Sequence, residues 1–479
     1  MGPRSAPSTI DGPVNVPGRE GTGPAPIPPD GAAARLPWRE VAWVAAVALG
    51  VRLVVALVAA RSPQGLHDPL LYQGFARHIA DGDGYLGLLG EPTAYYPPGY
   101  PLFLGAVQKA ADLIGLGDHL PAVAAVVQSL LGAVAAGATV VAGRRLSADP
   151  TRSRRIAIAA GLVVALWPGF VLYSAVLLSE TLFVALFAVV VACTLELGDL
   201  RRPRPVPAVV GAGCFGLAIL VRPQVLVALP LVAVAWWLAR AGWRRVLTGV
   251  GVAVLGAVVC VAPWTVRNVV VMGHLVPIST NGGDNLCIGF HDDATGGYDY
   301  GPECETEGSY VDGPDVEVER EAENRDRAVD WIVANPLAVP ALSVSKIWHT
   351  FSNDRDSLRA LESYEDDPFL ADWARSGLGT AFQVAYLVIL AGAVGGAVAL
   401  VGALRRRAAA ALLLLAFTVA GLLVPVMFFG DPRFKVAMVP CLALLAACGL
   451  DALVARRERR PGTDESVPER VGTAEPADG

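Results

Sequence analysis

Residues 66–105, LHDPLLYQGFARHIADGDGYLGLLGEPTAYYPPGYPLFLG, separate two strongly apolar segments of the chain. This polar and aromatic stretch begins with His67-Asp68-Pro69 and ends in the proline-rich turn that follows Tyr95. Connections between membrane helices are usually short. A long one that carries a carboxylate and a stiff aromatic turn therefore indicates a functional site.

The composition of the 479 residues predicts an integral membrane protein. Hydrophobic residues make up 54% of the chain and charged residues only 17%, which is too apolar for a water-soluble protein of this length. The net charge of -6 arises because acidic residues concentrate in one segment, 265–380, while arginines cluster in short segments elsewhere. Nothing in this pattern indicates a nucleic-acid partner.

Ten apolar runs are long enough to cross a membrane as helices. They are residues 38–60, 120–142, 156–177, 181–197, 206–220, 225–239, 246–263, 381–404, 408–428 and 435–454. We therefore expect an all-α polytopic membrane protein with about ten transmembrane helices in a membrane domain that covers residues 37–454. We expect disordered cytoplasmic tails at residues 1–36 and 455–479. The long polar stretch before the first apolar run favours a signal anchor over a cleaved signal peptide.

The arginine clusters predict the orientation of the chain, because short cytoplasmic loops carry most of the basic residues. A cytoplasmic N-terminus places every cluster inside if residues 97–116 form an interfacial or re-entrant helix rather than a span. Both termini are then cytoplasmic in the cell membrane. Residues 61–118 and 265–380 become extracytoplasmic loops, and the second has helical spacing over 316–334 and 337–351.

Two carboxylates are candidates for acid–base chemistry at this outer face. Asp68 near the apolar boundary could act as a general base toward a hydroxyl group, or it could cap the helix that starts at Pro69. Glu180 could be a second acid that orients an acceptor or holds a metal. It could equally cap the next helix together with Ser179, the N-cap candidate.

Arginines and tyrosines in the same layer could bind a phosphorylated sugar. Arg222 and Arg267 suit bidentate phosphate binding, and the alternative is that each extends to a lipid headgroup. Tyr95, Tyr96 and Tyr100 offer flat faces and hydroxyl groups for a sugar, although such residues also form interfacial belts.

Cysteines and metal-ligand types in the long loop give two further hypotheses. Cys287 and Cys304 could form a disulfide if the loop faces an oxidising compartment, whereas the other five cysteines lie in apolar runs. The histidines and neighbouring acids match no compact metal motif, so we expect no metal and no cofactor and keep a divalent ion as an alternative. No phosphate-binding loop, dinucleotide fingerprint or serine-nucleophile elbow is present in the sequence.

Several short motifs occur together over residues 41–453. They are Asp68 with Tyr72 and Ala76, Gly82-Asp83-Gly84-Tyr85, Tyr96-Pro97-Pro98-Gly99-Tyr100-Pro101, Ser179-Glu180, Arg222-Pro223, Pro263-Trp264 with Arg267-Asn268, and Asp431-Pro432-Arg433-Phe434. This pattern resembles the GT-C type membrane glycosyltransferases. Within them it is similar to bacterial relatives of the dolichyl-phosphate-mannose protein mannosyltransferases and of the lipid A aminoarabinose transferases, in glycosyltransferase family 39. The family often has a second acid beside the first-loop aspartate, where this chain has Pro69.

The resemblance implies a GT-C-like helix bundle that transfers a sugar, with inversion, from a polyprenyl-phosphate-linked donor outside the cytoplasm. The hydroxyl acceptor would belong to a glycolipid, a cell-wall glycan or a protein. By resemblance Asp68 is the catalytic base and Glu180 the second acid. Arg222, Arg267 and Arg433 would hold the donor phosphate, with Tyr95, Tyr96 and Tyr100 around the sugar.

Two other functions remain open from the sequence. A transporter or flippase of lipid-linked sugars predicts broken helices and ionisable residues near the middle of several spans, whereas the polar groups here gather at the outer face. A cell-wall glycan polymerase or ligase with a diphosphate-linked donor would use the same arginine and aspartate types.

Overall fold

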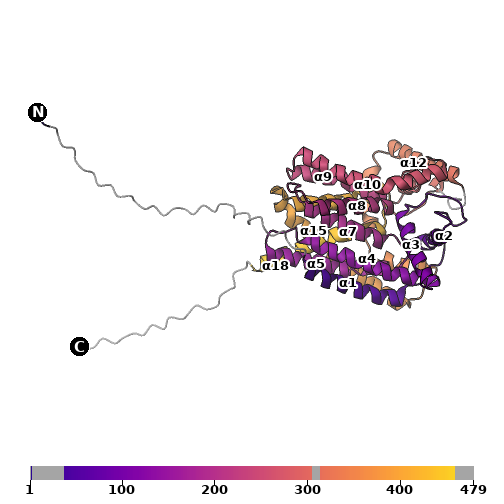
Figure 1. The fold of residues 1–479 in the computed structure, drawn as a ribbon, viewed down its shortest axis with the longest axis horizontal. Coiled ribbons are helices and arrows are strands. Elements are labelled where there is room, and N and C mark those ends of the chain that lie inside the picture. Colours follow the sequence, from indigo (N-terminus) through magenta and orange to yellow (C-terminus); the bar gives the residue numbers. More distant parts are fainter. Residues whose placement is uncertain (1, 3–36, 305–312, 459–479) are drawn as a thin grey trace. The chain divides into compact units, whose positions relative to one another are not determined.

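The computed structural model describes residue 2 and residues 37–304 and 313–458, and the part from Pro37 onward forms one compact unit. The tails predicted at 1–36 and 455–479 lie outside the described residues, apart from Gly2 and residues 455–458. Those four residues continue the last helix, which ends at Glu458. The described residues contain helices and a single isolated β-bridge, between Leu86 and Pro92 (Figure 1).

Each of the ten predicted apolar runs corresponds to helix in the described part of the chain. Seven helices are long and apolar enough to span a membrane: α1 (Trp38–Ala59), α4 (Leu120–Gly143), α7 (Glu180–Leu197), α10 (Trp243–Met272), α15 (Asp372–Arg405), α16 (Ala409–Met427) and α18 (Val439–Glu458). One further run is a bent pair, α5 (Pro150–Leu166) and α6 (Pro168–Leu172) with the 3-10 turn η2 (Tyr173–Ala175). The last two are the shorter α8 (Pro205–Val221) and α9 (Ala228–Leu238), the latter preceded by η3 (Pro223–Val227).

The bend between α5 and α6 replaces the straight helix predicted for residues 156–177, and its angle is 55°. Pro168 has no backbone N–H and so leaves the carbonyl of Val164 without its helical partner. The guanidinium of Arg52, fully buried in α1, donates instead to the carbonyl oxygens of Val164 at 3.0 Å and Ala165 at 2.9 Å. A charged residue in the first span therefore completes the backbone hydrogen bonding of a broken one.

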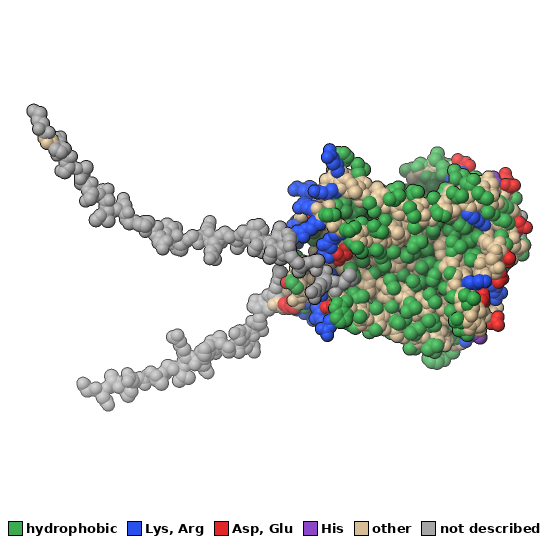
Figure 2. Space-filling view, viewed as in Figure 1, with side chains coloured by type: hydrophobic (Ala, Val, Ile, Leu, Met, Phe, Trp, Pro, Cys, Tyr) green, Lys and Arg blue, Asp and Glu red, His purple; other side chains and the backbone are tan. Residues whose placement is uncertain are grey.

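The two ends of the helix bundle differ in charge (Figure 2). Arginine clusters at 144–155, 201–204, 240–245 and 405–407 mark what we call the basic end. Residues 61–119, 273–304, 313–371 and 428–436 form the opposite, acidic end. A belt of hydrophobic side chains lies between them (Figure 2). This distribution, together with the apolar helices, is that of a multi-pass membrane protein.

The acidic end is built from further helices and 3-10 turns, most of them short. They are α2 (Asp68–Asp81), α3 (Gly99–Leu113), η1 (Gly117–His119), α11 (Gly282–Gly289), η4 (Pro302–Cys304), α12 (Pro314–Ala334), α13 (Val339–Phe351), α14 (Asp356–Leu361), η5 (Ser363–Glu365) and α17 (Pro432–Val436). The helices expected at 316–334 and 337–351 are thus present as α12 and α13. The helix expected within 97–116 is α3, which packs against α2.

The long loop is shorter than the predicted 265–380, because α10 continues to Met272 and α15 already begins at Asp372. Pro263 lies inside α10 without ending it. The turns that follow are held by side chains, since Asn268 Nδ2 donates to the carbonyl of Val276 at 2.9 Å. Both helices therefore reach beyond the predicted membrane boundary and support the acidic end.

Candidate active site

A cavity of about 570 Å³ lies at the acidic end of the bundle. Its walls come from segments far apart in the sequence: the start of α2, the turn around Tyr96, the helix junctions at Ser179 and Arg222, the long loop, and the turn before α17. The sequence predicted that the polar groups of these segments converge. The described structure brings most of them into one cavity.

Asp68 lines the cavity from the first turn of α2. Its side chain does not cap that helix. Its Oδ1 accepts a hydrogen bond from the Tyr96 hydroxyl at 2.8 Å, and its Oδ2 pairs with Arg433 Nη1 at 2.8 Å. The side chain is 27% exposed, so it is open to a ligand in the cavity. The capping alternative for Asp68 is therefore wrong.

Glu180 lies directly behind the cavity wall as the first residue of α7, and its side chain is 1% exposed. Its Oε1 pairs with Arg222 Nη2 at 2.6 Å and with Arg433 Nε at 2.7 Å. Ser179 makes no cap bond to the helix and accepts from Arg222 Nε at 3.1 Å. The result is a chain of alternating charges, Asp68–Arg433–Glu180–Arg222, which we call the ion chain.

The turn before α17 fixes the position of Arg433. Asp431 caps α17 by accepting a hydrogen bond from the backbone N–H of Arg433 at 2.7 Å. Burial, together with the nearby carboxylate of Asp356, raises the pKa of Asp431 to about 6. Asp356 also lines the cavity, and it accepts a hydrogen bond from the Tyr173 hydroxyl at 2.7 Å.

The neighbouring tyrosines Tyr95 and Tyr96 point their hydroxyl groups at different carboxylates. Tyr96 donates to Asp68, whereas Tyr95 donates to Asp284 Oδ2 at 2.9 Å. Their rings are nearly perpendicular, with centroids 5.0 Å apart. Tyr100, predicted to surround the sugar, is instead 1% exposed behind the wall. The helical register of α3 turns it inward, and its hydroxyl donates to Gln128 at 3.2 Å.

Arg267 does not line the cavity, although the sequence placed it with the phosphate-binding arginines. Its guanidinium donates to the carbonyl oxygens of Thr93 at 2.8 Å and Tyr85 at 2.7 Å, and it stacks over Trp264. These contacts hold the first loop against the end of α10. They leave Arg222 and Arg433 as the predicted arginines that reach the cavity.

The carboxylates and histidines do not form a metal site in the described residues. No group of three or more His, Cys, Asp or Glu side chains is placed to hold an ion there. Asp68 and Glu180 are joined by a guanidinium rather than left facing each other. The histidines His67 and His274 pair separately with Asp366 and Asp315. The residues present therefore do not fit a resident metal at the ion chain.

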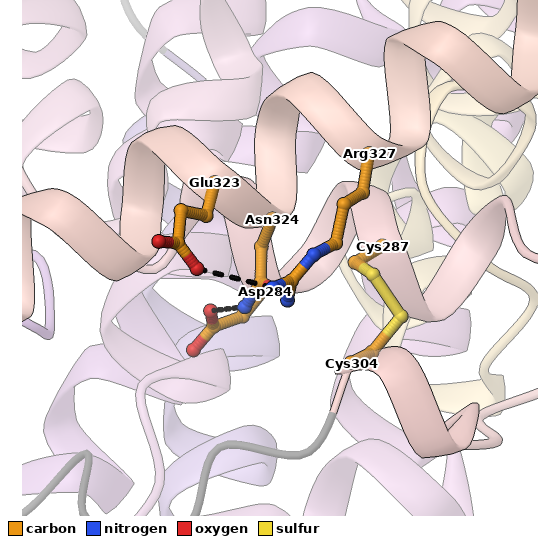
Figure 3. The surroundings of a disulfide bond; sticks show 6 residues. All are labelled: Asp284, Cys287, Cys304, Glu323, Asn324 and Arg327. Carbon is orange, nitrogen blue, oxygen red and sulfur yellow. Dashed lines mark hydrogen bonds and ion pairs between the residues drawn. A yellow bond between two sulfur atoms is a disulfide. The ribbon is translucent and has the colours of Figure 1, made fainter.

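The predicted pair Cys287 and Cys304 forms a disulfide, with the two Cα atoms 5.8 Å apart (Figure 3). The disulfide joins α11 to η4 and closes the segment between them into a loop. Tyr298 and Tyr300 lie within this closed segment and line the cavity. Reasoning from the sequence did not find these tyrosines.

Other residues of the cavity were also missed. Asp284, Asp356 and Arg359 line it from the long loop, where the sequence offers many acids and no motif that separates these from the rest. The helices that carry them, α11 and α14, were not predicted either, because the expected helices of this loop were 316–334 and 337–351. Only the tertiary fold selects which acids face the cavity.

The described residues thus form a helical bundle with a polar cavity at one end, walled by the first loop and by a long later loop. No protein-family model and no curated protein matches the sequence. Solved structures do resemble it. The archaeal oligosaccharyltransferase AglB from Archaeoglobus fulgidus, in complex with an inhibitory peptide and a dolichol-phosphate, is 14% identical with a TM-score of 0.50 over 87% of this chain and 50% of that one.

The apo form of the Archaeoglobus fulgidus oligosaccharyltransferase gives 15% identity and a TM-score of 0.51, over 88% of this chain and 51% of the other. ArnT from Cupriavidus metallidurans bound to undecaprenyl phosphate gives 18% identity and a TM-score of 0.39, over 88% of this chain and 80% of that one. The chain spans about half the length of the archaeal enzyme it matches. The likeness to the archaeal structures confirms the predicted GT-C fold.

Proposed function

We propose that this protein is a glycosyltransferase that moves a hexose or pentose from a polyprenyl-phosphate carrier to a hydroxyl acceptor, with inversion at the anomeric carbon. The observation that carries the proposal is the ion chain, in which an accessible carboxylate and two guanidinium groups meet in one cavity. These are the groups that such a reaction needs, a base for the attacking hydroxyl and cations for the departing phosphate.

In the reaction, Asp68 removes the proton of the acceptor hydroxyl as that oxygen bonds to the anomeric carbon. The bond from this carbon to the phosphate oxygen breaks, and the phosphate leaves with the electron pair. Tyr96 holds Asp68 in place through its hydroxyl group. The proton ends on Asp68 and the electron pair on the leaving phosphate, so this step needs no cofactor.

The ion chain couples the two halves of this reaction. Before transfer, the charges of Asp68 and Glu180 balance those of Arg222 and Arg433. When Asp68 takes the proton it becomes neutral, so that two guanidinium groups share the single charge of Glu180. The local charge is then positive at the moment when negative charge develops on the leaving phosphate, and this favours the transition state over the ground state.

The proposal also includes an orientation in the membrane, in which the cavity opens outside the cytoplasm and both termini lie in the cytoplasm. The basic loops at the opposite end support this orientation through the positive-inside rule. The disulfide at the acidic end supports it too, because such bonds persist in oxidising compartments. The archaeal structure with dolichol-phosphate has the same fold, which supports a lipid-linked donor.

The test compares Asp68→Asn with Asp83→Asn in purified protein reconstituted in liposomes with decaprenyl-phosphate-linked sugars. Asp83 is a matched control because it lies in the same loop, is 55% exposed and is outside the cavity. We expect Asp68→Asn to lower release of decaprenyl phosphate, measured by mass spectrometry, by about 100-fold or more, since a general base contributes that much. Normal turnover by this variant, with Asp83→Asn also normal, would refute the role of Asp68.

A further inference from the structure

One wall of the cavity takes no part in the proposed sugar transfer. It is formed by α11 and by the disulfide-closed segment after it, and its cavity-facing members are Asn281, Asp284, Asn285, Tyr298 and Tyr300. We call these five residues the loop subsite. They combine a carboxylate, two amides and two aromatic rings.

Asp284 is the polar centre of the loop subsite. Its Oδ2 accepts from the Tyr95 hydroxyl at 2.9 Å, and its Oδ1 accepts from Asn324 Nδ2 of α12 at 2.7 Å (Figure 3). Both donors are neutral, a phenol and an amide. Asp284 is only 2% exposed, so a ligand in the cavity would meet mainly the half-buried amides of Asn281 and Asn285, while Asp284 fixes the position of the Tyr95 hydroxyl beside them.

Tyr298 and Tyr300 add aromatic faces beside these polar groups. Their rings are 58% and 37% exposed, and the ring centroids are 5.3 Å apart at an angle of 85°. Tyr298 also rests against Phe429, 5.2 Å between centroids, in the turn that leads to Arg433. The aromatic faces and the ion chain therefore border the same cavity.

Exposed rings next to carboxylate and amide acceptors have the chemistry that recognises a neutral saccharide. The rings cover the C–H faces of a sugar, and the acceptors bind its hydroxyl groups. An anionic acceptor would face the charge of Asp284, and an acyl chain would find few apolar partners here.

We infer that the loop subsite binds a neutral oligosaccharide, which is the acceptor of the transferred sugar. Saccharide binding is inferred from the loop subsite alone, whereas the role of that saccharide as acceptor rests on the proposed function. Tyr95 and Tyr96 join the two regions, because adjacent residues contact Asp284 and Asp68. A saccharide held at the loop subsite can thus present its terminal hydroxyl to Asp68, which lines the same cavity.

The disulfide positions this subsite. Cys287 follows Asp284 by about one helical turn, so the bond to Cys304 anchors the short helix that carries the carboxylate. Figure 3 shows Asn324 of α12 directed at Asp284 from above, with the disulfide beside it. The disulfide ties α11 to η4, and the hydrogen bond from Asn324 ties it to α12.

The test measures binding of mannotriose, maltotriose and arabinotriose to the full-length protein in nanodiscs by calorimetry, without any donor. We expect saturable binding of at least one. Tyr298→Ala should weaken it about tenfold through loss of the ring face, whereas Tyr298→Phe, the matched control, should stay within about twofold. Asp284→Asn should weaken it about threefold to tenfold while retaining the shape of the side chain.

The outcomes separate this inference from the proposed function. No saturable binding of any of the three trisaccharides, or equal binding by the wild type, Tyr298→Ala and Asp284→Asn, would overturn the loop subsite. Saccharide binding that responds to these variants, in a protein that releases no decaprenyl phosphate, would overturn the transferase function and leave the subsite standing. Asp83→Asn, a change outside the cavity, should bind the trisaccharide within about twofold of wild type.

Discussion

Replacing Arg433 by lysine keeps the positive charge of the ion chain but removes the fork that spans two carboxylates. Arg433 contacts Glu180 through Nε at 2.7 Å and Asp68 through Nη1 at 2.8 Å. One ammonium group cannot reach both positions in that geometry. Arg433→Lys should therefore lose one charge-assisted hydrogen bond and with it the coupling between base and phosphate.

The expected magnitude follows from that single lost bond. A hydrogen bond to a charged group contributes about 1.5–3 kcal/mol, which corresponds to about a 10- to 150-fold lower rate of sugar transfer if the bond acts in the transition state. The assay is single-turnover release of decaprenyl phosphate in liposomes. Arg375→Lys is the matched control, because Arg375 binds Glu362 and Asp372 outside the cavity. Transfer by Arg433→Lys at the rate of this control would refute the coupling.

Three further predictions concern stability and binding. The raised pKa of Asp431, about 6, makes the free energy of unfolding fall as the pH rises toward and through that value, since the folded state holds the proton more tightly. Thermal unfolding at about pH 5 and about pH 7 should show this fall in wild type and much less of it in Asp431→Asn, and equal slopes would contradict it. Arg267→Lys should lower the unfolding temperature, because the Arg267 guanidinium donates to backbone carbonyls of the first loop. The affinity of this variant for decaprenyl phosphate should stay within about twofold of wild type. A tenfold loss of affinity would instead identify Arg267 as a phosphate ligand. The double variant Cys287→Ser/Cys304→Ser should lose about 3 kcal/mol of stability and therefore unfold at a lower temperature than wild type. Adding reductant should not lower its unfolding temperature further. An unfolding temperature equal to that of wild type would count against a structural disulfide.

The sequence allowed the architecture to be predicted because membrane helices are encoded locally. Ten apolar runs became helices, and the charges of the short loops assigned the two ends of the bundle. Helix ends were less predictable. α10 continues past Pro263 because tertiary contacts of Arg267 and Asn268 support its last turns.

The candidate site could be predicted only in part. Asp68, Glu180, Arg222 and Arg433 follow conspicuous helix boundaries or turns, and the structure places them in one chain of ion pairs. Asp284 stands among many acids of the long loop, so only the fold shows that it contacts Tyr95. Whether an arginine faces a ligand or a backbone carbonyl depends on neighbours distant in sequence.

The contact between Arg52 and the bent span has a consequence for the order in which the membrane domain assembles. The carbonyl oxygens of Val164 and Ala165 would lack donors inside a bilayer, where each unpaired backbone group costs several kcal/mol. The bent form of α5 and α6 is therefore unfavourable until α1 lies beside it. Because α1 precedes them in the chain, insertion from the N-terminus places the guanidinium in the membrane before the helix that needs it.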